Sequence, residues 1–140
     1  MENNKTIEFL VRAIIIDEQG RILVCRKRGS DYYFFPGGHV EFSESSEQAL
    51  RREIQEELGL VIESISFVGG TEHKFTEDRI EHHEINLVYK VQVKEIKTES
   101  KEDHLEFFLF TKEQLQKGII FPEILKKHIN DNKVFWESAI

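Results

Sequence analysis

Residues 38–60 read GHVEFSESSEQALRREIQEELGL, and this stretch decides the fold. It predicts a helix over residues 45–58, because Ser45 or Ser46 can accept a hydrogen bond from the first free backbone N–H groups. Gly59 follows the last turn, where a left-handed residue commonly ends a helix. We therefore expect a loop that leads into a capped helix.

The predicted helix has two distinct faces. With about 3.6 residues per turn, its apolar side chains form one stripe that can pack on a sheet: Leu50, Ile54 and Leu58. Three acidic side chains gather on the neighbouring face: Glu53, Glu56 and Glu57. Like charges at this spacing repel, and the negative end of the helix dipole disfavours anions. The acidic face is either a solvated surface or a cation site.

The segment before the helix favours a cation site. Pro36-Gly37-Gly38 lets the backbone approach a ligand closely and offers carbonyl oxygens. Oxygen ligands without clustered thiols or imidazoles suit a hard cation, Mg²⁺ or Mn²⁺.

The spacing of these residues matches a known signature. Every specified position of the Nudix box is filled, in the order Gly38-x5-Glu44-x7-Arg52-Glu53-Ile54-x-Glu56-Glu57-x-Gly59-Leu60. The chain therefore resembles the Nudix hydrolases. This resemblance implies an α/β fold, a Nudix-type α/β/α sandwich with a mixed β-sheet flanked by helices.

The resemblance also implies roles for individual residues. The metal ligands would be the carbonyl of Gly37 and the carboxylates of Glu53, Glu56 and Glu57. Arg52 would orient a catalytic carboxylate, and Glu44 would assist near the helix start. Many family members add a carboxylate from beyond the box. Glu106 is our candidate, with a polar strand start as the alternative reading, and Glu84 is a second contender.

The implied reaction is hydrolysis of a pyrophosphate linkage by water, helped by a divalent cation and without a covalent enzyme intermediate. The general base is Glu53, Glu56 or Glu106, a choice that spacing leaves open. The substrate would be a nucleoside diphosphate linked to another moiety, such as a nucleoside triphosphate, ADP-ribose or a nucleotide sugar, or a dinucleoside polyphosphate. The alternative is a non-catalytic Nudix domain that senses a nucleotide, although such domains usually lose box carboxylates and this chain has lost none.

Composition narrows the setting. The chain has 140 residues and a formal net charge of −7, so we expect a single domain over residues 1–140 that does not bind duplex nucleic acid. Its single cysteine permits no internal disulfide, which fits the cytoplasm. No apolar run approaches the length of a membrane span, so no membrane contact is expected.

Other polar residues have two readings each. Arg26, Lys27 and Arg28 could meet substrate phosphates, or form plain surface at a strand exit. His39, inside the box, could contact phosphate. His82 and His83 are adjacent in a predicted strand and so point to opposite faces, which argues against one ion held by both. The segment 130–140 packs either on the domain or on a second subunit of a homodimer.

Hydrophobic patterning predicts the remaining elements. Strands are expected at residues 7–16 and 21–26, which should form a hairpin, and at 32–35, 65–75, 84–93 and 105–111. The last of these is apolar on both faces and is predicted to lie inside the sheet. Short helices are expected after Thr111 and at residues 122–129.

Overall fold

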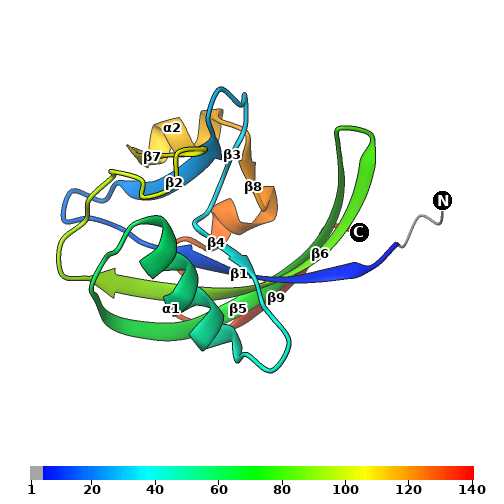
Figure 1. Cartoon of the computed structure of the whole chain (residues 1–140), viewed down its shortest axis with the longest axis horizontal. Helices are drawn as coiled ribbons and strands as arrows, with labels where there is room; N and C mark the ends of the chain where they lie inside the picture. The colour runs from blue at the N-terminus through cyan, green and yellow to red at the C-terminus, as the bar shows by residue number, and fades with distance from the viewer. Residues whose placement is uncertain (1–4) are drawn as a thin grey trace.

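The computed structural model describes residues 5–140, so the polar start of the chain at residues 1–4 lies outside the described residues. Figure 1 shows the elements in order. They are β1 (Ile7–Ile14), β2 (Ile22–Lys27), β3 (Tyr33–Phe34), β4 (Gly37–His39), α1 (Ser46–Glu57), β5 (Ile62–Glu77), β6 (Ile80–Val93), β7 (Leu105–Phe110), α2 (Lys112–Lys117), β8 (Ile120–Phe121), the 3₁₀ helix η1 (Glu123–His128) and β9 (Phe135–Ser138).

The strands form two sheets within the described residues. One is five-stranded, in the order β4-β1-β6-β5-β9, and the other is four-stranded, in the order β7-β2-β3-β8. Both are mixed: β1 runs parallel to β6 and antiparallel to β4, while β3 runs antiparallel to β2 and parallel to β8. Helix α1 contacts β1 and β4, α2 contacts β7, and η1 contacts β8 (Figure 1). The predicted α/β fold, with mixed sheets flanked by helices, is confirmed.

Helix α1 begins and ends as its sequence predicts. The hydroxyl of Ser45 accepts a hydrogen bond from the Gln48 backbone N–H, and the Gln48 side chain accepts one from the Ser45 backbone N–H. This capping box satisfies two free donors of the first turn. Leu50 and Ile54 are buried, so the apolar stripe packs on the sheets as expected.

Two apolar clusters hold the layers together. The first joins the stripe of α1 to both sheets through side chains such as Val11, Leu23 and Phe107. The second packs α2 and η1 against the sheets around Phe35 and Val88. Full burial of one such side chain contributes about 1.5–3 kcal/mol relative to exposure, so the first cluster contributes substantially to fixing α1 on the sheets.

The predicted hairpin of the first two strands is wrong. The turn exists, with the Asp17 carboxylate accepting hydrogen bonds from the backbone N–H groups of Gln19 and Arg21. Beyond an isolated bridge between Ile16 and Ile22, however, β1 and β2 separate into different sheets. Both strands are largely buried, and each pairs with strands distant in sequence, which local patterning does not reveal.

The predicted interior position of β7 is also wrong. Leu105 and Phe107 pack into the first cluster and Phe108 packs against the second, so both faces are covered as the sequence suggests. Yet β7 is an edge strand of the four-stranded sheet. A pattern that is apolar on both faces reports what lies above and below a strand, and says nothing about its lateral neighbours.

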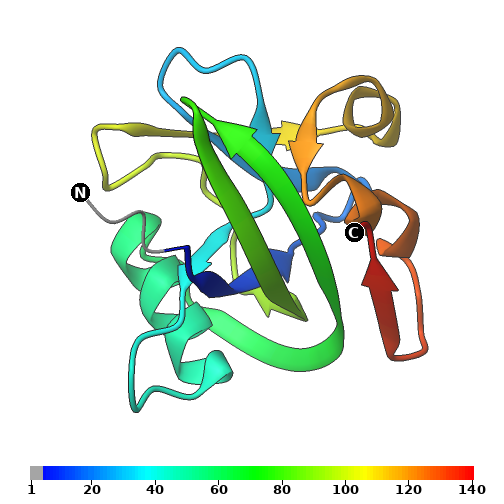
Figure 2. The ribbon, with the colours of Figure 1, turned by 90° about the vertical axis from the view of Figure 1, so that its right-hand side faces the viewer.

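Strands β5 and β6 extend further than predicted and join through a two-residue turn at Asp78 and Arg79, both with positive φ. In Figure 2 this hairpin crosses the front of the molecule, between α1 and β9. Strand β9 pairs parallel with β5, so residues 135–138 of the C-terminal segment pack on the rest of the chain. Within the described residues no helix is both long enough and apolar enough to cross a membrane.

Candidate active site

A pocket of about 350 Å³ opens where α1 and the two sheets meet. Strands β1, β4, β5 and β6 of one sheet contribute to its wall, as do β2, β3, β7 and β8 of the other. Its size lies in the range typical of small-molecule sites.

The box helix presents two of its three glutamates to this pocket. Glu53 and Glu57, one turn apart, both line it. Glu56 does not line it: its side chain is 52% exposed and accepts a hydrogen bond from Arg52 Nη1 at 3.4 Å. In the described part of the chain, the three carboxylates do not bring one oxygen each within 4.8 Å of one another.

The two glycines before the helix lie in close packing with their neighbours. Gly37 has φ +150°, and a Cβ there would lie 1.8 Å from the backbone oxygen of Val11. A Cβ on Gly38 would lie 2.4 Å from the carboxyl carbon of Glu53. Both glycines line the pocket, and Gly38 lies directly against the Glu53 carboxylate.

Burial and the hydrogen-bonded neighbour Glu53 raise the pKa of Glu57 to about 9. A proton shared by two close carboxylates is the usual result when no cation balances their charge. The positive charge of Arg12, which is buried, opposes this shift. Arg12 donates hydrogen bonds to Asn86 Oδ1 and to the Phe35 carbonyl oxygen, at 2.9 and 3.0 Å.

Arg52 braces the loop against the helix. Its guanidinium donates two hydrogen bonds to the Glu44 carboxylate, one to Glu53 Oε1 at 3.0 Å and one to the carbonyl oxygen of His39 at 3.1 Å. The bonds from Arg52 lower the pKa of Glu44 to about 2, and those to Glu44 and Glu53 raise the pKa of Arg52. The structure thus brings Arg52, Glu44 and Glu53 together.

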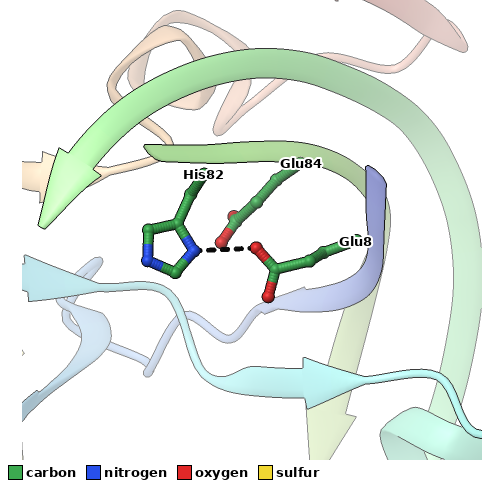
Figure 3. Close-up of side chains that lie close together, drawn as sticks. All are labelled: Glu8, His82 and Glu84. Atoms are coloured by element: carbon green, nitrogen blue, oxygen red, sulfur yellow. Dashed lines mark hydrogen bonds and ion pairs between the residues drawn. The ribbon is translucent and has the colours of Figure 1, made fainter. Parts of the chain in front are cut away.

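The opposite wall carries a second group of polar side chains. Glu8 Oε2 pairs with His82 Nδ1 and Glu8 Oε1 pairs with His39 Nε2, each at 2.8 Å. Burial raises the pKa of Glu8, but the two imidazoles outweigh it and the net shift is downward. Glu84, from the same face of β6 as His82, is only 6% exposed. One ligand atom each from Glu8, His82 and Glu84 lies within 4.8 Å of the other two (Figure 3).

Sequence reasoning missed most of this group. Glu8 was not singled out, and His82 was dismissed because its neighbour His83 faces the other way. The useful signal was His82 and Glu84, two residues apart in a strand and therefore on one face. Glu84, our second contender for an extra carboxylate, lines the pocket, and so does the predicted substrate contact His39.

Glu106 is not brought to the box. It lies opposite Arg26 in the β2–β7 ladder, with Glu106 Oε1 3.5 Å from Arg26 Nε. Arg26 lies over the rings of Tyr33 and Phe108, outside the pocket. Alternation along β7 turns Glu106 to the side opposite the pocket-lining Leu105. The position of Glu106 therefore fits the alternative hypothesis, a polar residue at the start of a strand.

Of the basic residues at the end of β2, some line the pocket and others do not. Arg28 donates a hydrogen bond to the Asp103 carbonyl oxygen and does not line the pocket. Lys27, the third basic residue of this group, lines the pocket and pairs with Glu77 at 3.1 Å.

Aromatic rings complete the wall. Tyr32 and Phe34 line the pocket, while Phe35 is fully buried in the core. Phe75 and Phe121 stack with ring centroids 5.4 Å apart and line it as well. Flat apolar rings beside charged groups suit a ligand with an aromatic part and an anionic part.

Comparison with known proteins places the chain in a family. The family model described as NUDIX domain matches residues 9–131. The chain is 44% identical over 63 residues to the RNA pyrophosphohydrolase of Teredinibacter turnerae, and 41% identical over 61 residues to that of Hahella chejuensis. Each alignment covers 44% of this chain but only 37% and 38% of the respective relatives.

Solved structures show the same fold. The mutator MutT protein from Bacillus halodurans matches with a TM-score of 0.75 at 16% identity, over 94% of this chain and 88% of that one. The MutT Nudix hydrolase from Burkholderia pseudomallei matches with a TM-score of 0.74 at 21% identity, over 91% of this chain and 100% of that one. With the box complete and the family model covering residues 9–131, the chain belongs to the Nudix family.

Proposed function

We propose that this chain is a divalent-metal-dependent pyrophosphohydrolase that cleaves a nucleoside diphosphate linked to another moiety. One observation carries the proposal. The carboxylates of Glu53 and Glu57 line the same pocket as Gly37 and Gly38, with Gly38 directly against Glu53, and this pocket also holds a buried arginine and aromatic rings.

The chemistry of these groups fits a hard cation. Carboxylate oxygens and a backbone carbonyl are the ligands that Mg²⁺ and Mn²⁺ prefer. The buried Glu57, whose pKa is raised beside Glu53, can exchange its proton for a cation. The proposed ligands are the Gly37 carbonyl and the carboxylates of Glu53, Glu57 and the more exposed Glu56.

When bound, the cation supplies charge neutralisation for the phosphates and a lowered pKa for attacking water. Glu53 is the proposed proton acceptor, because Arg52 and Gly38 fix its position. Water attacks phosphorus, the new P–O bond forms, the bridging P–O bond breaks, and the electron pair leaves with the departing phosphate. Arg52 acts through Glu53 and Glu44 and has no direct role at phosphorus.

The substrate class follows from the pocket and from the relatives. Phe34, Phe75 and Phe121 can pack against a base, while Arg12 and Lys27 can face anionic groups. Relatives named RNA pyrophosphohydrolase add the 5′ end of RNA to nucleoside triphosphates, nucleotide sugars and dinucleoside polyphosphates as candidates. The net charge of −7 argues against a long phosphate backbone and for recognition of a chain end or a small nucleotide.

The test is a substrate panel. Release of phosphate, pyrophosphate or nucleoside monophosphate is followed with Mg²⁺ and with Mn²⁺, for each substrate class and for triphosphorylated RNA. The proposal expects metal-dependent turnover of at least one class and its loss in Glu53→Gln. Tight binding of one nucleotide without turnover of any substrate would favour the alternative, a nucleotide sensor.

A further inference from the structure

Three side chains on the pocket wall opposite the box have ligand atoms close together: Glu8, His82 and Glu84. One ligand atom from each lies within 4.8 Å of the others. They come from adjacent strands in register, since Glu8 pairs with Glu84 across β1 and β6. Figure 3 shows the three side chains pointing toward one another. A tetrahedral ion with bonds of about 2.1 Å places its ligands about 3.4 Å apart, so small side-chain movements suffice.

A fourth residue points independently to a missing ligand. His73 is only 6% exposed, and neither of its ring nitrogens has a hydrogen-bond partner among residues 5–140. Its Nε2 faces Glu84 Oε1 at 3.5 Å, without hydrogen-bond geometry. Buried polar atoms are nearly always satisfied in folded proteins. An unsatisfied imidazole aimed at a carboxylate of the cluster is what a metal site without its ion leaves behind.

We propose that Glu8, His82 and Glu84 bind a divalent transition-metal ion, with Zn²⁺ as the best fit and His73 as the fourth ligand. The donor set explains the choice of ion. Imidazole nitrogen with carboxylate oxygen suits Zn²⁺ and its neighbours, whereas Mg²⁺ prefers oxygen alone. His39, paired with Glu8 Oε1, orients that carboxylate from outside the site.

This site is separate from the box. Among residues 5–140 no hydrogen bond or ion pair joins the cluster to the box glutamates, and Arg12 interacts with each: its Nη2 lies 3.8 Å from Glu84 Oε1, and its charge opposes the raised pKa of Glu57. The box thus offers oxygen ligands and the cluster offers imidazole nitrogen with carboxylate oxygen. The charge of Arg12 interacts with the carboxylates of both. The proposal does not depend on the proposed function, since ion binding is read without turnover.

The test uses the full chain, freed of metal by chelation and then saturated with Mg²⁺. Co²⁺, a spectroscopic substitute for Zn²⁺, is titrated in and followed by its visible absorption. We expect about one Co²⁺ per chain, displaced by Zn²⁺, and at least tenfold weaker binding in His82→Ala and Glu84→Gln. The matched control is His83→Ala, adjacent in β6 but on the other face, with affinity within twofold of wild type.

Two results would overturn the proposal. The first is Co²⁺ binding unchanged in both His82→Ala and Glu84→Gln. The second is Co²⁺ binding abolished by Glu56→Gln, which would locate the ion at the box. Circular dichroism confirms folding of each variant, and the isosteric Glu8→Gln replaces any variant that does not fold. If the cluster does not bind Co²⁺, the Mg²⁺-dependent turnover expected of the proposed function is still observed. If the chain is instead a nucleotide sensor without turnover, the cluster still binds Co²⁺.

Discussion

Arg52 and Glu44 are joined by a two-pronged pair, from Nε to Oε2 at 2.7 Å and from Nη2 to Oε1 at 3.0 Å. The guanidinium reaches Glu53 with its remaining nitrogen. A planar fork of this kind fixes direction as well as distance. The loop residue Glu44 and the helix carboxylate Glu53 are therefore held by one side chain.

Arg52→Lys is expected to lower kcat by about 10- to 100-fold, because a single ammonium cannot hold Glu44 and Glu53 together. Steady-state kinetics on the best substrate of the panel measure the change. Arg51→Lys, next to it but paired only with Glu47 on the exposed face, is the control and should stay close to wild type. Equal kinetics for the two variants would contradict the proposed role of Arg52.

Glu44→Gln should change the acid dependence of stability. The pKa of Glu44 is lowered to about 2 in the folded chain, from an ordinary value of 4.5. The ionised form therefore stabilises the fold fully above pH 4.5, and this contribution is lost as the pH falls from 4.5 toward 2. Urea unfolding across that range should show wild type and variant converging at low pH. A gap that is constant with pH would refute the assignment.

Glu57→Gln should leave the metal-free fold intact, since the amide can still donate a hydrogen bond to Glu53 as the protonated acid does. Stabilisation by Mg²⁺ should shrink. At a concentration 100 times its dissociation constant, an ion contributes about 2.7 kcal/mol, and tenfold weaker binding reduces this to about 1.4 kcal/mol. Thermal unfolding with and without Mg²⁺ measures the difference. Glu113→Gln on α2, an exposed carboxylate, is the control.

Gly37→Ala and Gly38→Ala should separate folding from activity. At Gly37 the new Cβ meets backbone and the φ of +150° is unfavourable, so a loss of about 1–3 kcal/mol or more is expected. At Gly38 the Cβ meets only the end of the Glu53 side chain, which can turn away. Denaturant unfolding should show little change for Gly38→Ala, while kcat should fall at least tenfold. Equal stability losses would contradict this distinction.

The helix and its loop were predictable because their signals are local. The Ser45–Gln48 cap, the apolar stripe of Leu50 and Ile54, and the glycines before the helix all act within a few residues. The box spacing then implied the fold, since a full match over residues 38–60 is specific. The helix and its loop could therefore be predicted without knowing any contact between residues distant in sequence.

Other parts depend on pairings that are distant in sequence. Strand β1 pairs with β6 instead of β2, and this pairing brings Glu8 beside Glu84. Sequence reasoning favoured Glu106 over Glu84. Both residues stand at the start of predicted strands, and only the fold shows which of the two faces the pocket. The Asp78-Arg79 turn was missed because it lacks the glycine that usually marks such turns.

Arg12 links the two ends of the pocket thermodynamically. One buried guanidinium serves Glu57 at one end and Glu84 at the other. A cation that neutralises the carboxylates at one end weakens their hold on Arg12, so the guanidinium can shift toward the carboxylates at the other end, and the affinities of the two ends are interdependent. Such interdependence is reciprocal: the factor by which the first ion changes the affinity for the second equals the factor by which the second changes that for the first.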